Sequence, residues 1–302
     1  MSLKFYNTLT RKKEAFKSIH KNFVGIYSCG PTVYWYAHLG NFRTYIFSDL
    51  LKRVLIFNKY KVKHIMNITD VDDKTIKGSV KEGLSLNELT EKYEKIFLED
   101  MDSMGIMKPT ILKATDNINQ MISIIKKLLE KKYAYIASDG IYFSISKFKN
   151  YGKLANLRKI KETKERIKND EYDKENPQDF ALWKFYTKDD GDVFWNTEIG
   201  KGRPGWHIEC SAMSMKILGE HFDIHTGGTD LIFPHHTNEI AQSESFSGKK
   251  FVNCWMHGGF LTINDDKMSK SLGNIWTLRE LIEKNFSPFD YRYFCLTGHY
   301  RK

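Results

Sequence analysis

Apolar residues in the first quarter of the chain follow the two basic periodicities of secondary structure. Residues 23–34, FVGIYSCGPTVY, begin with a β-branched run and end in a Gly-Pro turn, which predicts a strand and a turn. Residues 41–60 carry apolar side chains at helical spacing, and residues 61–70, KVKHIMNITD, have the composition of a second strand. This order predicts the start of a parallel α/β sheet.

The middle of the chain interrupts this order. Residues 86–105 and 116–133 are amphipathic and predict helices. Residues 133–145 alternate around Asp139-Gly140, which predicts a hairpin, and the mostly charged residues 158–177 predict a solvated loop. Beyond them, strand, glycine-rich turn and helix recur.

The recurring pattern ends near residue 284. Thr277 and Glu280 form a capping box, which predicts a helix over 278–284. Two α/β halves, roughly residues 20–105 and 200–280, therefore flank an insertion of helices, a hairpin and a charged loop.

Composition narrows the class of protein and partner. Lys and Arg exceed Asp and Glu by 47 to 37, a net charge of +10, which suits a polyanionic partner but also fits a generally Lys-rich chain. No apolar run approaches the ~18–20 residues of a membrane span, and the polar N-terminus lacks a secretory signal. We therefore expect a cytoplasmic protein.

Four dispersed cysteines without a C-x-x-C motif exclude a disulfide framework and a zinc ribbon. Residues 233–239, FPHHTNE, nevertheless look like part of a metal site. On a helix, Glu239 shares a face with His235 at four residues and with His236 at three. Because one helix supplies too few donors, the remaining ligands must come from distant segments.

Two loops have the character of phosphate-binding segments. In AHLGNFRT, residues 37–44, His38 and Asn41 flank Gly40 at the start of a predicted helix, where free N–H groups favour phosphate. In KMSKS, residues 267–271, Lys267 and Lys270 can converge on a pyrophosphate. An ordinary helix cap and ordinary surface lysines would explain either loop taken alone.

Taken together, HLGN and KMSKS resemble the paired signatures of class I aminoacyl-tRNA synthetases. Longer strings resemble the cysteinyl-tRNA synthetase family, in order from residue 27 to 274: YSCGPTVY, NITDVDDK, GRPGWHIECSAM, DIHTGGTDLIFPHHTNEIAQ, WMHGGF and KMSKSLGN. Asn41 departs from the family signature, which often has a second histidine there, although Asn can still donate to phosphate.

The resemblance implies an α/β fold with a Rossmann-like parallel sheet split by an inserted connective-peptide subdomain. The implied boundaries are 1–110 and 196–276 for the two halves of the catalytic domain, 111–195 for the insertion and 277–302 for the start of a helical region. The family normally continues into an anticodon-binding domain, which this chain is expected to lack. We accordingly expect a monomer that activates cysteine but charges tRNA poorly.

The resemblance also implies one zinc ion, held by Cys29, Cys210, His235 and Glu239. Cys254 and Cys295 are interpreted as small buried hydrophobes. His236 is expected beside the metal ligands or facing the nucleotide. Zinc prefers thiolate to alcohol, so in this family the substrate's own sulfur is expected to bind it, which separates cysteine from serine.

The implied reaction joins L-cysteine to the 3′ end of tRNA(Cys) through cysteinyl-adenylate, with ATP and Mg²⁺. The triphosphate is assigned to the four residues His38, Asn41, Lys267 and Lys270. Gly40 is assigned to close approach of the ATP to the backbone. Gly228 and Asp230 are assigned to the adenosine, with Asp230 accepting from its ribose hydroxyls. The substrate pocket is assigned to Thr69, Trp206, His207 and His225.

Three alternatives remain. A cysteine ligase of the mycothiol-pathway type would use the same adenylate with an amino-sugar acceptor. A zinc hydrolase would use Glu239 as base, but HHTNE lacks the H-E-x-x-H order. A structural zinc in a nucleic-acid-binding module would leave both phosphate loops unexplained.

Overall fold

The computed structural model describes residues 3–157, 178–263, 266–268 and 274–302. Its centre is a five-stranded parallel sheet of order β11-β10-β3-β4-β5. The strands are β3 (Phe23–Ser28), β4 (Lys61–Ile68), β5 (Thr110–Lys113), β10 (Phe222–Gly228) and β11 (Val252–Gly258). The α/β class with a Rossmann-like parallel sheet, predicted from the sequence, is confirmed.

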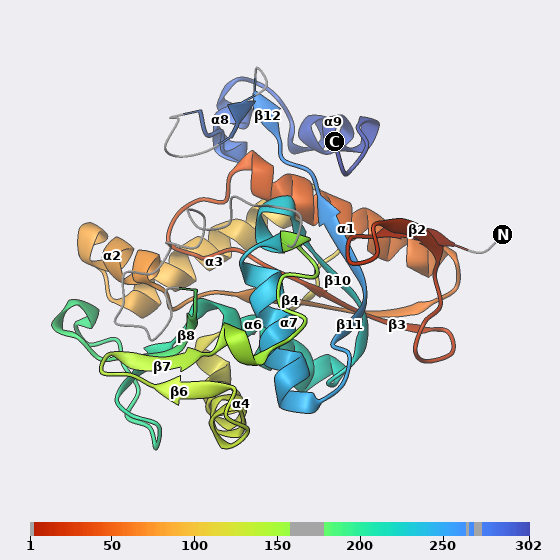
Figure 1. The fold of residues 1–302 in the computed structure, drawn as a ribbon. Helices are drawn as coiled ribbons and strands as arrows, with labels where there is room; N and C mark the ends of the chain where they lie inside the picture. Colours follow the sequence, from red (N-terminus) through yellow and green to blue (C-terminus); the bar gives the residue numbers. More distant parts are fainter. Residues whose placement is uncertain (1–2, 158–177, 264–265, 269–273) are drawn as a thin grey trace.

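Helices cover both faces of this sheet (Figure 1). Helix α1 (Leu39–Phe57) packs on one face, where Ile26, Phe47 and Ile224 share a buried cluster. Helices α6 (Trp206–Leu218) and α7 (His235–Ser247) pack on the other face with α4 (Ile118–Glu130). Helices α2 (Asp73–Glu82) and α3 (Leu86–Ser103) connect β4 to β5.

A separate antiparallel sheet of order β6-β7-β8-β9 interrupts the parallel one in sequence. It contains β6 (Ala134–Ile136), β7 (Gly140–Phe143), β8 (Phe180–Phe185) and β9 (Gly202–Pro204). The hairpin expected at Asp139-Gly140 is confirmed as β6 and β7. The charged segment 158–177 lies outside the described residues, and the predicted domain boundaries stay a prediction.

Four short strands and two helices complete the described fold. Strands β1 (Lys4–Asn7) and β2 (Lys12–Ala15) form a hairpin beside β11, and β12 (Thr262–Ile263) pairs with β13 (Asp266–Lys267). Helix α8 (Leu278–Glu283) begins at the predicted capping box, where Thr277 Oγ1 accepts from the Glu280 N–H at 3.4 Å. Helix α9 (Pro288–Thr297) packs on α1.

No helix among those in the described part of the chain is both long and apolar enough to cross a membrane.

Candidate metal centre and adjoining cleft

Alternation along the central strands sends one set of side chains toward α6 and α7. On β3, Ile26 packs in the cluster under α1. Tyr27, and Cys29 directly after the strand, belong to the cluster under α6 and α7. On β11, Cys254 and Trp255 divide in the same way. Because side chains alternate faces with a period of two, the strand ends deliver Cys29 to the α6 and α7 face.

Helices α6 and α7 bring the other candidate ligands to this face. Cys210 lies in the second turn of α6, while His235 is the first residue of α7 and Glu239 follows one turn later. All four predicted zinc ligands are buried, the most exposed being Cys29 at 6%. They come from segments that are up to 210 residues apart in the sequence.

The donor atoms of these four residues lie within 4.8 Å of one another. The Cys29 and Cys210 sulfurs are 3.9 Å apart, Cys29 Sγ is 3.8 Å from Glu239 Oε1, and His235 Nε2 is 3.1 Å from the same oxygen. Tetrahedral zinc places two thiolates ~3.8 Å apart and a nitrogen and an oxygen ligand ~3.4 Å apart. The arrangement therefore fits a zinc-sized ion.

A second set of four donors overlaps the first. It keeps Cys29 and Glu239 but replaces the other two with His225 and His236, again within 4.8 Å. His236 Nε2 is 3.3 Å from Cys29 Sγ, and His225 Nε2 is 2.8 Å from Glu239 Oε2. His236 is wholly buried, so its ring borders the candidate ligands and not the solvent.

Electrostatics distinguish the two sulfurs. Burial opposes ionisation of Cys210, but the hydrogen bond from Cys29 and the charge of His235 outweigh it and lower the pKa of the Cys210 thiol to about 6. Burial and the neighbouring Cys210 instead raise the pKa of Cys29. The charges of Cys210 and Glu239 raise the pKa of His235 to about 10 despite its burial.

Further histidines orient the candidate ligands. His207 Nδ1 is 2.9 Å from His235 Nδ1, which leaves Nε2 of His235 toward Glu239. His236 Nδ1 contacts His257 Nε2 at 2.8 Å, and His257 Nδ1 contacts Thr8 Oγ1 at 2.8 Å. Sequence reasoning missed His257 and Thr8, because nothing in their local pattern indicates contacts made across more than 200 residues.

A cleft of about 570 Å³ opens beside the cluster. Cys29 lines it at one end with Trp206, which is 40% exposed and lies 4.3 Å from the His235 ring between centroids. The predicted nucleotide residues His38, Gly40, Asn41, Gly228 and Asp230 also line this cleft. The structure thus brings the candidate ligand Cys29, the HLGN loop and the segment with Gly228 and Asp230 to a single cavity.

The first loop is fixed by its own helix and by a distant segment. Asn41 Oδ1 accepts from the His38 N–H at 3.1 Å, so the side-chain amide nitrogen is the group that remains to donate to a ligand. The Leu39 N–H donates to Trp276 O at 2.8 Å, and His38 pairs with Thr277 in a β-bridge. The residues after the KMSKS loop therefore brace the HLGN loop.

The KMSKS loop is only partly described. Lys270 lies outside the described residues, and for Lys267 the backbone position in β13 is the only described feature. Met268 is buried and lines the cleft, which brings the beginning of this loop to the cavity. The roles of both lysines stay predictions.

Three of the four expected substrate residues are buried and do not line the cleft. Thr69 is buried and donates to Glu209 Oε2 at 2.7 Å. His207 and His225 contact the candidate ligands His235 and Glu239. Trp206 is the exception, since its ring lines the cavity.

Comparison with known proteins identifies the family of the chain. Residues 15–302 match the family described as tRNA synthetases class I (C) catalytic domain. The chain therefore belongs to this family, as the sequence motifs predicted.

The relatives are named more narrowly. The chain is 58% identical over 302 residues to the cysteine–tRNA ligase of Brachyspira hyodysenteriae, covering 99% of this chain and 64% of that one. It is 54% identical over 303 residues to the cysteine–tRNA ligase of Chlamydia pneumoniae, with the same coverage. The chain thus spans about 64% of the length of these curated relatives.

Solved structures resemble the chain in fold. Methionyl-tRNA synthetase from Mycobacterium tuberculosis, in complex with methionyl-adenylate, superposes with a TM-score of 0.70 at 15% identity, covering 91% of this chain and 64% of that one. A putative arginyl-tRNA synthetase from Campylobacter jejuni gives a TM-score of 0.61 at 12% identity, covering 95% of this chain and 65% of that one. At these identities the likeness is one of fold.

Proposed function

We propose that this chain activates L-cysteine with ATP, forming cysteinyl-adenylate and pyrophosphate, and that cysteine then passes to the 3′ end of tRNA(Cys). One observation carries the proposal. A buried Cys/Cys/His/Glu cluster reaches the cleft through Cys29, and the same cleft is lined by the HLGN loop and by Gly228 and Asp230. The names of the curated relatives support the same activity.

The metal in the proposal is zinc, held by Cys29, Cys210, His235 and Glu239. Zinc bound there would prefer the substrate's thiolate to the serine hydroxyl, so it would supply the selectivity. The chain needs such a device because a hydrophobic pocket separates near-isosteres by only ~1–3 kcal/mol. Trp206, together with Thr69, His207 and His225 beneath it, would shape the space for the amino acid.

Adenylate formation requires no protein nucleophile, because the substrate carboxylate attacks the α-phosphorus of ATP. The work of the chain is positioning and neutralisation of charge. His38, Asn41, Lys267 and Lys270 would hold the triphosphate, with Mg²⁺ accompanying the ATP. Gly228 would admit the adenosine close to the backbone, and Asp230 would accept from its ribose hydroxyls.

ATP–pyrophosphate exchange with cysteine and with serine, before and after removal of zinc, tests the proposal. We expect exchange with cysteine alone and its loss on stripping, with recovery when zinc returns. Equal exchange with both amino acids, or exchange unchanged in metal-free protein, would refute the recognition mechanism. Charging of tRNA(Cys) is measured separately, since a failure there would leave the activation step intact.

A further inference from the structure

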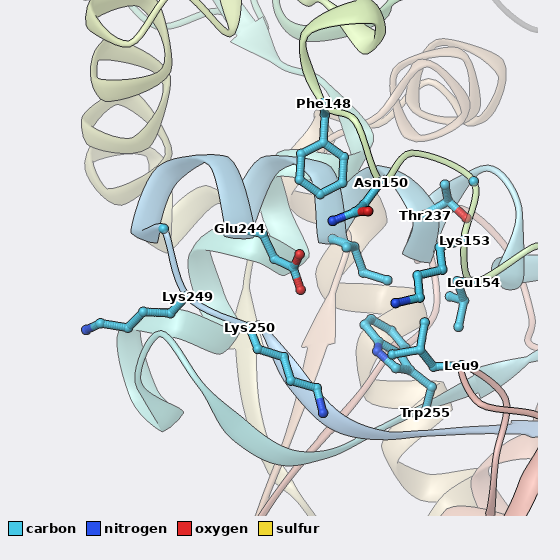
Figure 2. A pocket seen from close by; sticks show the side chains of 13 residues that line it. Leu9, Phe148, Asn150, Lys153, Leu154, Thr237, Glu244, Lys249, Lys250 and Trp255 are labelled. Carbon is cyan, nitrogen blue, oxygen red and sulfur yellow. The ribbon is translucent and has the colours of Figure 1, made fainter.

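A second hollow of about 350 Å³ is lined in part by α7 and shares no lining residue with the cleft (Figure 2). We call it the rear pocket. Three segments form it: Leu9 in the turn between β1 and β2, residues 148–154, and the stretch from Thr237 on α7 to Trp255 on β11. Its volume lies in the range of small-molecule sites.

The rear pocket has an apolar floor. Leu9, Phe148, Ile240 and Trp255 contribute its large hydrophobic side chains. Its rim is held in place by Arg11, whose guanidinium donates to the carbonyl oxygens of Lys153 at 3.2 Å and Leu154 at 3.3 Å. A cavity with an apolar floor and a fixed rim is suited to an organic molecule, and less so to a bare ion.

Charges of both signs face this floor. Figure 2 shows the Glu244 carboxylate and the Lys153 ammonium extending toward the same space, with Lys250 below them. Lys249 instead extends away, and it pairs with Glu220 at 2.5 Å. Burial raises the pKa of Glu244, although the Phe251 N–H and the charge of Lys250 oppose the shift. The Glu244 Oε1 atom accepts a hydrogen bond from the Phe251 N–H at 3.2 Å.

We propose that the rear pocket binds a free α-amino acid with an apolar side chain. The ammonium of such a ligand would meet Glu244, its carboxylate would meet Lys153 and Lys250, and its side chain would cover Leu9 and Trp255. An organic monoanion lacks the partner for Glu244, and an amine lacks the partner for the lysines. A ligand that carries both charges on one small apolar body would pair with the charged groups of the pocket and cover its floor.

The rear pocket and the metal cluster both contact Trp255, but no candidate metal ligand lines the rear pocket. Trp255 is its floor on one side, and on the other it stacks on His225 with ring centroids 4.5 Å apart. His225 in turn contacts Glu239 Oε2 at 2.8 Å. The test must therefore keep the cleft filled, so that binding behind α7 is not mistaken for binding at the substrate site.

Isothermal titration calorimetry of the zinc-loaded protein, saturated with a non-hydrolysable cysteinyl-adenylate analogue, provides that test. L-leucine and L-phenylalanine are titrated beside 4-methylpentanoate and 3-phenylpropionate, which lack the amino group, and isopentylamine and phenethylamine, which lack the carboxylate. We expect the amino acids to bind at least tenfold more tightly than either analogue series. Equal affinity across the three series, or no binding, would overturn the proposal.

Three variants locate the site. Glu244→Gln and Lys153→Met should each weaken binding about tenfold or more, whereas Lys249→Met, on the same rim but paired with Glu220, should bind like the parent. Unchanged affinity in both Glu244→Gln and Lys153→Met would also overturn the proposal. Exposed Lys153 lies outside the cleft, so cysteine-dependent exchange in Lys153→Met should match the parent. Absence of cysteine-dependent exchange in the parent would refute the proposed function. The amino acids are then titrated without the analogue, and the Glu244→Gln and Lys153→Met variants still report whether they bind in the rear pocket.

Discussion

Gly30 controls the position of the metal cluster although it donates no ligand. It follows Cys29 directly, and its N–H donates to Asn67 Oδ1 at 2.9 Å. A Cβ atom at this position would overlap the carbonyl oxygen of Asn67 and lie 2.9 Å from Met66 Cγ. The strand end carrying Cys29 and the end of β4 approach each other so closely that only glycine fits.

Gly30→Ala must therefore move one of these strand ends by about 1 Å, since the overlap is with backbone and not with a flexible side chain. Metal–ligand distances tolerate only about 0.2 Å. We expect zinc affinity to fall about 10- to 100-fold, the loss typical of disturbing residues around metal ligands. Cysteine-dependent exchange should fall about 100-fold, because misplacement by about 1 Å has that effect on reacting groups.

Gly25→Ala is the matched control. It lies in the same strand, but its new methyl group would meet only the end of the Leu218 side chain, at 3.2 Å. Zinc content by chelator competition and exchange rates are measured for both variants, with thermal unfolding to verify that each folds. A folded Gly30→Ala protein with parental zinc affinity would refute the reasoning.

Two further predictions concern single side chains. Asn41→Asp keeps the oxygen that accepts from the His38 N–H but puts a negative charge where the amide nitrogen would donate to phosphate. The KM for ATP in the exchange assay should therefore rise about 10- to 100-fold. The melting temperature should change little. Burial raises the pKa of Asp100 to about 6, with Arg279 opposing it. Because this exceeds the unfolded value of about 3.9, the stabilisation is present below about pH 4 and lost as pH rises through 6. Asp100→Asn should therefore raise the free energy of unfolding at pH 7.5 by about 1–2 kcal/mol and flatten its dependence between pH 4 and 6, measured by urea denaturation. A parental pH profile would contradict that account.

Local sequence patterns predicted much of the central parallel sheet and its first helix. The strand-turn-helix-strand order predicted for residues 23–70 is confirmed as β3, α1 and β4. These segments could be predicted because their apolar residues recur with the period of a strand or a helix. Helix α2 was not predicted, since it is only ten residues long and includes Gly78. Strand β5, at four residues, is too short to show a period. Its place at the sheet edge depends on pairing with β4, which local sequence does not encode.

The candidate metal site also contains a part that local sequence predicts and a part that it does not. Helical spacing grouped Glu239 with His235 and His236 and favoured His235, at four residues, while tolerating His236. Cys29 and Cys210 came from resemblance to a family. Contacts that orient these groups, such as His257 on β11 with Thr8 in the turn after β1, join segments far apart in the chain. Only the folded sheet brings them together, so no local pattern could indicate them.

Cys210 distinguishes the two overlapping donor sets, because it belongs to only one of them. The set with His235 contains two thiolates, whereas the set with His225 and His236 contains one. Zinc favours the first, because thiolate is a ligand that it binds readily and the first set offers two. Cobalt(II) in place of zinc gives a sulfur-to-metal charge-transfer band whose intensity follows the number of thiolate ligands. Cys210→Ser should halve this band and weaken metal binding if His235 completes the set. If the band is unchanged in Cys210→Ser but moves to another wavelength in His236→Asn, the metal site consists of the set with His225 and His236 instead.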